Sequence, residues 1–269
     1  MSDTVHLGLS TCPNDTFLIH GLYSGAVDPR GLSIEYTFAD VQELNQGLRA
    51  GRFHVGKGSY ALAIELEDRL DPLPVGSALG FGVGPVLLAA ETRAAALESP
   101  RVLCPGADTT ATLLLRILHP EWTRIEQVVF SEIMPALSAG AADLGVCIHE
   151  GRFTYQAAGL HCLEDLGATW EQQTGAPLPL GGLFARRDLD PELRTRIEAL
   201  LVESLEYGWA HREETVVTMT RFAQEMTPAV QFQHVDLYVN GWTRDLGDEG
   251  RRAIALLRER AQTCRLRPS

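Results

Sequence analysis

The chain has 269 residues, of which 45% are hydrophobic and 22% charged, so its length suits one large domain or two smaller lobes. This composition is typical of a globular protein and excludes a disordered chain, a collagen-like fibre and a coiled coil. With 35 acidic and 23 basic residues the net charge is −12. Such a surface repels polyanions, so we expect no nucleic-acid partner and no docking to an anionic membrane.

The five cysteines contain no C-x-x-C pair, so the sequence indicates neither a disulfide framework nor a structural zinc site. No basic stretch followed by an apolar one stands at the N-terminus, so we expect no secretory signal and a cytoplasmic protein. The long uncharged run Pro72–Ala90 is interrupted by proline and glycine, which favours turns and strands over a membrane span.

Short apolar runs alternate with amphipathic stretches, a pattern typical of an α/β fold with parallel strands and crossover helices. In chain order, the predicted strands are Val5–Leu9, Leu32–Phe38, Phe53–Val55, Gly82–Ala89, Arg101–Cys104, Gln127–Phe130, Leu144–Ile148 and Leu180–Ala185. The predicted helices are Asp15–Ser24, Val41–Ala50, Tyr60–Leu66, Thr109–Leu118, Ile133–Ala139 and Thr169–Gln173. From Asp190 to Thr263 the pattern is helical almost throughout.

Two local patterns support the predicted helices. Asp40 followed three residues later by Glu43 has the form of a capping box. In the helical tail, one apolar stripe faces a core and is formed by Ile197, Leu200, Leu201 and Leu205.

The chain also repeats a pattern. A predicted strand runs into Cys12-Pro13-Asn14-Asp15-Thr16, and a later one runs into Cys104-Pro105-Gly106-Ala107-Asp108-Thr109. The motif L-x-A-G-x4-G then occurs at Leu48–Gly56 and again at Leu137–Gly145. Common turn chemistry can produce such a match, and the alternative is two lobes built on one plan.

Under the second interpretation, residues 1–88 and 186–269 form the first lobe, with the helical tail, and residues 89–185 form the second. The segments Gly82–Ala89 and Leu180–Ala185 are the natural hinges. In α/β folds, ligands bind at the carboxyl ends of the strands, so loops after strands in both lobes are expected to line the ligand site.

Lys57 is the only lysine among the 23 basic residues and lies between two glycines, just past an apolar strand. A site that needs a compact ammonium does not accept Arg, which favours an anion contact. Gly58 and Ser59 add close backbone approach and a hydroxyl at the start of a helix. The alternative is a solvated loop lysine.

Thr109 and Thr110 open a predicted helix, where hydroxyls and N–H groups can meet a carboxylate, although plain helix capping is an equal alternative. His149 is the only one of eight histidines that ends an apolar strand. It can act as a general base, with Glu150 fixing its tautomer, or it can be a structural histidine. The sequence lacks the motifs of a phosphate-binding loop, a dinucleotide-binding turn, a nucleophile elbow and a histidine metal site.

Several motifs together resemble the 1,4-dihydroxy-6-naphthoate synthase family of the futalosine route to menaquinone. They cover nearly the whole chain and are Ser10–Phe17 (S-x-C-P-N-D-T-F), Gly82–Pro85, Pro105-Gly106 with Thr109-Thr110, His149–Tyr155 (H-E-x-R-F-T-Y) and Leu178–Gly181.

The resemblance implies a two-lobed, type II periplasmic-binding-protein-like fold used as a lyase, with a small anionic substrate held between the lobes and no metal or other cofactor. The implied substrate is cyclic dehypoxanthinyl futalosine, and the implied general base is His149. The implied substrate contacts are Lys57, Gly58, Ser59, Thr109 and Thr110. The alternatives are chorismate dehydratase, which shares the fold and part of the pattern, and a non-catalytic cytoplasmic binder of a small carboxylate.

Overall fold

The computed structural model describes residues 4–92, 94, 97–149, 151–223 and 227–265. The chain divides into two compact units, one containing residues up to Leu79 with Gly181–Arg251 and the other containing Gly80–Leu180 with the residues from Arg252 onward. The chain therefore passes between units after Leu79, Leu180 and Arg251, and the last crossing lies inside helix α12 (Gly247–Arg265). The lobe boundaries expected from the sequence stay a prediction.

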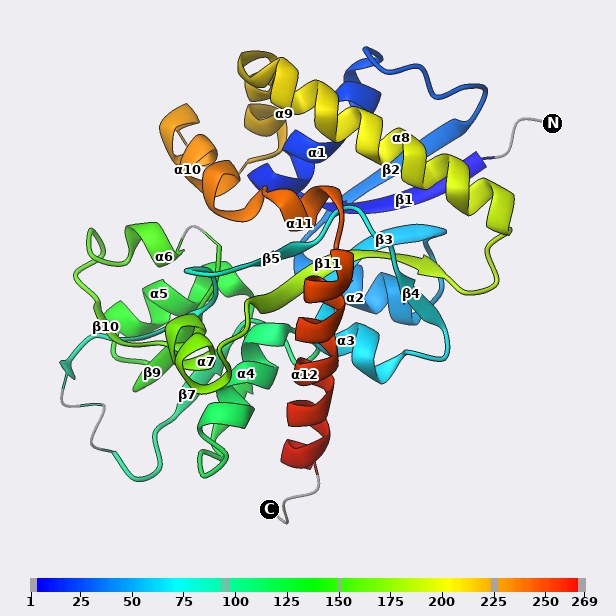
Figure 1. Ribbon diagram of the computed structural model, residues 1–269. Coiled ribbons are helices and arrows are strands. Elements are labelled where there is room, and N and C mark those ends of the chain that lie inside the picture. The colour runs from blue at the N-terminus through cyan, green and yellow to red at the C-terminus, as the bar shows by residue number, and fades with distance from the viewer. Residues whose placement is uncertain (1–3, 93, 95–96, 150, 224–226, 266–269) are drawn as a thin grey trace. The chain divides into compact units, whose positions relative to one another are not determined.

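The sheet of the first unit has the strand order β2-β1-β3-β11-β4, and β5 pairs with β11 (Figure 1). β1 is parallel to both of its neighbours, whereas β11 is antiparallel to β3 and β4. The strands are β1 (Thr4–Ser10), β2 (Ser33–Ala39), β3 (Val55–Ser59), β4 (Leu70–Pro72), β5 (Ala78–Gly80) and β11 (Leu178–Arg186).

Helix α1 (Pro13–Ser24) packs on this sheet and contacts α8 (Pro191–Ala210), α9 (Thr215–Phe222) and α10 (Pro228–Tyr238) (Figure 1). The predicted stripe from Ile197 to Leu205 is buried in the core that these helices form with β1, which confirms that face of α8. Shorter helices complete the unit: α2 (Val41–Arg49), α3 (Tyr60–Glu65), the 3-10 turn η2 (Arg212–Glu214) and α11 (Gly241–Arg244).

The second unit has a five-stranded sheet in the order β10-β6-β9-β7-β8. β7 is parallel to β8 and β9, and β6 is antiparallel to β9 and β10. The strands are β6 (Val86–Ala89), β7 (Val102–Cys104), β8 (Ile125–Gln127), β9 (Leu144–Cys147) and β10 (His161–Asp165). The helices are α4 (Thr110–Leu118), α5 (Phe130–Ser138), α6 (Gly151–Thr154) and α7 (Leu166–Thr174).

The two units repeat one topology, which confirms the repeat predicted from the sequence. In each, the run β-α-β-α-β places its first strand in the centre, its second on one side and its third on the other, all parallel, with an antiparallel strand next to the third. The run is β1-α1-β2-α2-β3 in the first unit and β7-α4-β8-α5-β9 in the second.

The L-x-A-G motif ends α2 and α5 in the same way. Gly51 and Gly140 follow these helices with φ of 69° and 68°. Each donates its N–H to the leucine of the motif, Leu48 or Leu137, at 3.0 Å, and the next residue donates to the residue before that leucine. This is a Schellman cap, in which glycine avoids the cost of a left-handed residue.

The Cys-Pro pairs, in contrast, are not equivalent. Cys12 is the N-cap of α1, and Pro13 is its first residue. Cys104 is the last residue of β7, and α4 begins six residues later, after the N-cap Thr109. The Cys-Pro pair therefore lies at the start of a helix in one unit and at the end of a strand in the other.

Of the other predictions for helices and strands, some are confirmed and some are wrong. The capping box is confirmed, since Asp40 accepts from the N–H of Gln42 and of Glu43, and its own N–H donates to the Glu43 side chain. The strand expected over Gln127–Phe130 is wrong beyond its first residue, because β8 ends at Gln127 and Phe130 begins α5. None of the individually predicted strands covers β4, β5 or β10. Across the described ranges, no helix combines the length and apolar character that a bilayer span requires.

Candidate active site

Lys57 lies inside strand β3 and not in a loop, which corrects the expectation from its flanking glycines. Its side chain is 9% exposed. The ammonium group lies 2.8 Å from Oδ1 of Asp15 and donates to the carbonyl oxygen of Gly76 at 3.1 Å. A solvated lysine is therefore excluded, and two of the three N–H donors have protein acceptors.

Asp15 stands in the first turn of α1 and is 2% exposed. Its Oδ2 accepts from the N–H and the hydroxyl of Ser10, at 3.1 and 2.5 Å, and its Oδ1 also accepts from the amide of Asn14 at 2.8 Å. Oδ1 of Asn14 lies 3.0 Å from Nε2 of buried His234. Since the amide oxygen only accepts, Nε2 of His234 carries the proton in this arrangement. The Lys57–Asp15 pair is thus one part of a buried polar network.

Gly58 and Ser59 are held by helix α2. The N–H of Ser59 donates to Oδ1 of Asn45 at 2.9 Å, and the Asn45 amide donates to the Ser59 hydroxyl at 3.1 Å. A Cβ on Gly58 would lie 2.5 Å from Cδ1 of Leu48. Close packing of α2 on β3 therefore explains the glycine without a ligand, and Ser59 keeps its own O–H as a donor.

Tyr60 begins α3, directly after Ser59, and its hydroxyl belongs to a second polar cluster. Its hydroxyl lies 2.6 Å from the Ser77 hydroxyl, and burial raises its pKa well above the usual range, so the phenol is neutral. Thr243 donates to the Ser77 carbonyl at 3.0 Å. Gly182 leaves room for this arrangement, because a Cβ there would lie 2.9 Å from the phenol oxygen.

In the second unit, Thr109 is the N-cap of α4. Its hydroxyl accepts from the N–H of Thr112 at 3.2 Å and donates to the Gly106 carbonyl at 2.7 Å. The Thr110 hydroxyl donates to the carbonyl of Leu180 at 2.6 Å. Capping by Thr109 is therefore confirmed, the substrate contact stays a prediction, and both hydroxyl protons have protein acceptors.

His149 follows β9 by two residues and adopts a left-handed backbone with φ of 54°. It and Arg30 are the two non-glycine residues with positive φ in the described part of the chain. Its half-buried imidazole packs edge-on against Phe130, with ring centroids 5.1 Å apart and an interplanar angle of 67°. Glu150, expected to fix the tautomer, lies outside the described residues.

In each unit, the predicted residues gather at one edge of the sheet. Carboxyl ends of parallel strands meet at the same edge. In the second unit, Thr109 follows β7, Phe130 follows β8 and His149 follows β9. In the first unit, the same edge carries the Lys57–Asp15 network at the ends of β1 and β3.

The side chains that surround the predicted site residues are not among the predicted ones. They are Ser10, Asn14, Asp15, Asn45, Phe130 and His234. The first three lie within the quoted S-x-C-P-N-D-T-F motif, so the resemblance carried a signal for them. His234 has no such signal, because a single histidine in a helix is most often structural.

Two other features do not add to the site. Burial raises the pKa of the Cys104 thiol to about 12, so it is not a thiolate nucleophile at neutral pH. Among the residues that the structure describes, no group of three His, Cys, Asp or Glu is placed to hold a metal ion.

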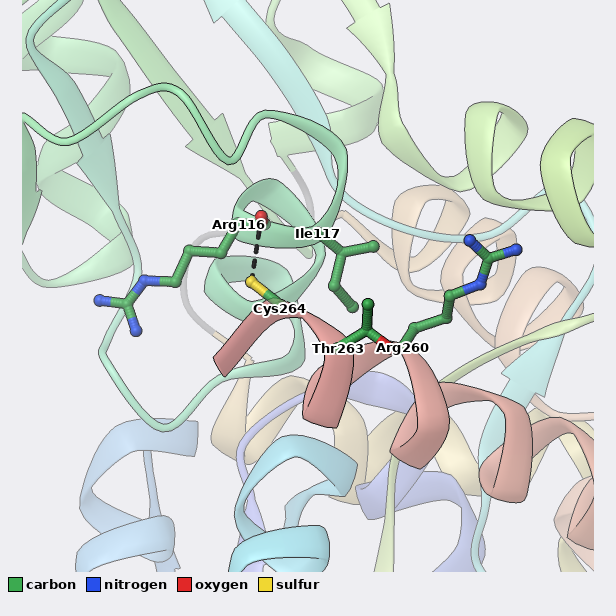
Figure 2. A pocket seen from close by; sticks show the side chains of 5 residues that line it. All are labelled: Arg116, Ile117, Arg260, Thr263 and Cys264. Carbon is green, nitrogen blue, oxygen red and sulfur yellow. Dashed lines mark hydrogen bonds between the residues drawn. The ribbon is translucent and has the colours of Figure 1, made fainter. Parts of the chain in front are cut away.

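A small cavity lies between α4 and the end of α12, with a volume of about 40 Å³. Figure 2 shows its lining, with the thiol of Cys264 donating to the Arg116 carbonyl and the guanidinium groups of Arg116 and Arg260 extending away from each other. This space suits one or two water molecules and not a bicyclic ligand.

Comparisons with known proteins bear on the family. A family model described as menaquinone biosynthesis matches residues 5–263. A 1,4-dihydroxy-6-naphtoate synthase of Thermus thermophilus is 42% identical over 255 residues, covering 95% of this chain and 93% of that protein.

Solved structures bear on the fold. Protein AF1704 from Archaeoglobus fulgidus matches with a TM-score of 0.93 at 28% identity, covering 98% of both chains. The periplasmic aliphatic sulphonate binding protein SsuA from Escherichia coli matches with a TM-score of 0.66 at 15% identity, covering 98% of this chain and 87% of that one. The α/β, periplasmic-binding-protein-like fold is thus confirmed, and the match to the family model over residues 5–263 shows that the chain belongs to the menaquinone biosynthesis family.

Proposed function

We propose that this protein is a 1,4-dihydroxy-6-naphthoate synthase, a carbon–carbon lyase that converts cyclic dehypoxanthinyl futalosine to 1,4-dihydroxy-6-naphthoate. The observation that carries the proposal is the 42% identity to an enzyme of that name over 95% of this chain. In the reaction, a sugar-derived fragment leaves while the remaining bicycle becomes aromatic, which makes the step downhill. The substrate is a small anion, and the reaction is proposed to take place in the cytoplasm.

His149 is the proposed general base. Removal of a proton by a positioned base is typically worth about 10²–10⁴-fold in rate. Its left-handed backbone supports this role, because strained non-glycine residues cluster at functional sites. The edge contact with Phe130 restricts the ring and gives the base an apolar neighbour suited to a carbon bicycle.

The proposed substrate contacts are Lys57, Gly58, Ser59, Thr109 and Thr110. Lys57 keeps one ammonium donor beyond its bonds to Asp15 and Gly76, and Ser59 keeps its hydroxyl proton. Because Asp15 neutralises Lys57, this pair suits hydroxyl oxygens of the substrate as well as a carboxylate.

The test uses purified protein, cyclic dehypoxanthinyl futalosine and mass-spectrometric detection of dihydroxynaphthoate. The variant is His149→Asn, because Asn tolerates a left-handed backbone while Ala adds strain at φ of 54°. We expect product from the wild type and a loss of at least about 10²-fold in kcat for the variant, at unchanged thermal midpoint. The matched control is His161→Asn, at an exposed histidine of the same unit.

Each other outcome contradicts a different part of the proposal. Full turnover by His149→Asn would rule out His149 as the base. Binding of the futalosine derivative without product would indicate a non-catalytic binder, and conversion of chorismate alone would indicate a dehydratase.

A further inference from the structure

The side chain of Arg152 joins three segments of the second unit. One nitrogen, Nη2, lies 2.5 Å from Oδ2 of Asp165 and donates to the Gly82 carbonyl at 3.2 Å, while Nη1 donates to the Gly84 carbonyl at 3.2 Å. The Arg152 side chain is only 16% exposed. A planar guanidinium can make several such bonds at once, which the single ammonium of Lys cannot reproduce.

The backbone of Arg152 belongs to the turn that carries His149. Its N–H donates to the His149 carbonyl at 3.4 Å, and the N–H of Gly151 donates to the Ile148 carbonyl at 3.1 Å. His149 has φ of 54° in this turn. A non-glycine residue persists in such a conformation only where its surroundings fix it.

The groups that Arg152 binds are themselves fixed. Oδ1 of Asp165 caps α7 by accepting from the N–H of Ala168 at 3.1 Å. The N–H of Gly82 donates to the Glu171 carboxylate of the same helix at 2.6 Å. Gly84 has φ of 126°, and a Cβ there would lie 2.8 Å from Leu178. The groups that accept from Arg152 are therefore themselves held by helix α7 and by close packing.

We propose that Arg152 is a positioning residue that holds the turn of His149 in its left-handed conformation and so aims the imidazole. The expected effect of Arg152 on turnover rests on the proposed function. The expected effect of Arg152 on the position of the His149 imidazole does not. Under this proposal, the arginine of the H-E-x-R-F-T-Y motif acts through His149 and does not need to contact the substrate.

The first measurement is steady-state kinetics of Arg152→Lys. We expect kcat to fall by about 10²-fold, since a displacement of about 1 Å at a reacting group costs that much, while KM changes little. The matched control is Arg101→Lys. Arg101 also binds a carboxylate, that of Glu126, and a backbone carbonyl, that of Ala141, but at the opposite edge of the same sheet. This control is expected to keep wild-type kcat.

The second measurement does not depend on turnover. In protein labelled with nitrogen-15 in histidine, the ring signals of His149 are those lost in His149→Asn. We expect Arg152→Lys to shift or broaden these signals and Arg101→Lys to leave them unchanged. In kinetics, adding Arg152→Lys to His149→Asn should cost no further kcat, because groups that act through one another are not additive.

Unchanged ring signals in Arg152→Lys would overturn the proposal, whatever the activity. A fall in kcat that matches only the loss of folded protein at the assay temperature would overturn it as well. If the ring signals shift while His149→Asn keeps full activity, Arg152 positions His149 but the proposed base is wrong, so the two failures are distinguishable.

Discussion

The ammonium of Lys57 is held between a carboxylate and a carbonyl oxygen inside the first unit. A buried ion pair of this kind contributes little net stability compared with apolar residues, but removal of one partner leaves an uncompensated charge. Asp15 has further donors in Ser10 and Asn14, so its charge is also stabilised by hydrogen bonds. The pair is therefore expected to be sensitive to single substitutions and tolerant of joint ones.

Asp15→Asn and Lys57→Met are each predicted to destabilise the protein by about 3–5 kcal/mol, whereas the double variant regains a large part of that loss. Calorimetry of thermal unfolding ranks the stabilities of the single and double variants. The control is Arg30→Gln, which breaks the exposed pair with Glu203 and should cost about 1 kcal/mol or less. Single variants as stable as this control would show that the buried pair is unimportant for stability.

Lys57 and Asp15 differ in how far the sequence alone could predict their roles. Lys57 could be singled out because it is the only lysine, but its two glycine neighbours suggested a loop. The glycines instead allow α2 to pack closely on a buried strand, which only the tertiary structure shows. Asp15 could not be paired with Lys57 by spacing, because they are 42 positions apart and two elements, β2 and α2, lie between them.

Helix α4 is joined to two other elements at its C-terminus. There, Nε2 of His119 lies 2.6 Å from Glu164 of β10, Nδ1 lies 3.4 Å from Glu121, and the ring stacks on Trp122 at 4.0 Å. Glu164 in turn accepts from Thr169 of α7 at 2.7 Å. A titratable group thus connects α4, β10 and α7.

Opposing effects act on the pKa of His119. Burial of the ring lowers it, but the hydrogen bonds and charges of Glu164 and Glu121 outweigh burial and raise it above the usual 6.5. The hydrogen bond to His119 lowers the pKa of Glu164. A raised histidine pKa means that the contribution to stability is complete below the unfolded value and is lost as pH rises through the folded one.

His119→Gln is therefore predicted to lower the thermal midpoint at about pH 6 and to lower it less at about pH 9, because the contribution of the charged ring is lost as pH rises through its folded pKa. The measurement is a pH series of thermal unfolding for both proteins. His161→Gln, at an exposed histidine of β10, is the control and should change the midpoint little. An equal loss at both pH values would mean that packing on Trp122 outweighs the charge.

The helices and strands that could be predicted from the sequence are those with a clear local pattern. The stripe of α8 and the capping box of α2 could be predicted, because both depend on local spacing. β10 could not, because His161–Asp165 is a polar edge strand without alternation. β4 and β5 have three residues each, too few for a period to appear.

Each unit of the molecule has its own hydrophobic core, built on the same topology. Leu48 of α2 packs over Gly56 of β3, and Leu137 of α5 packs over Gly145 of β9, at matching places in the two units. The L-x-A-G-x4-G motif therefore reports a real structural repeat, whereas the Cys-Pro pairs do not. The alternation of strands and helices predicted the α/β class and the repeat predicted two similar units, whereas the periplasmic-binding-protein-like topology was predicted only from the family resemblance.

The matching glycines provide a test of the two units. A Cβ on Gly145 would lie 2.5 Å from Ile133, and one on Gly56 would lie 3.0 Å from Leu48. Gly145→Ala and Gly56→Ala are each predicted to destabilise their unit by about 1–3 kcal/mol through overpacking, with Gly145→Ala the larger.

Hydrogen exchange read by mass spectrometry locates the effect, because a unit that opens cooperatively exchanges as one segment. We expect Gly56→Ala to speed exchange in peptides of β1, α1 and β3, and Gly145→Ala to do so in peptides of β7, α5 and β9. Arg101→Lys, at the surface, should speed exchange in neither set. If either glycine variant speeds exchange equally in both sets, the two units unfold as one, and the separate cores do not act as separate cooperative units.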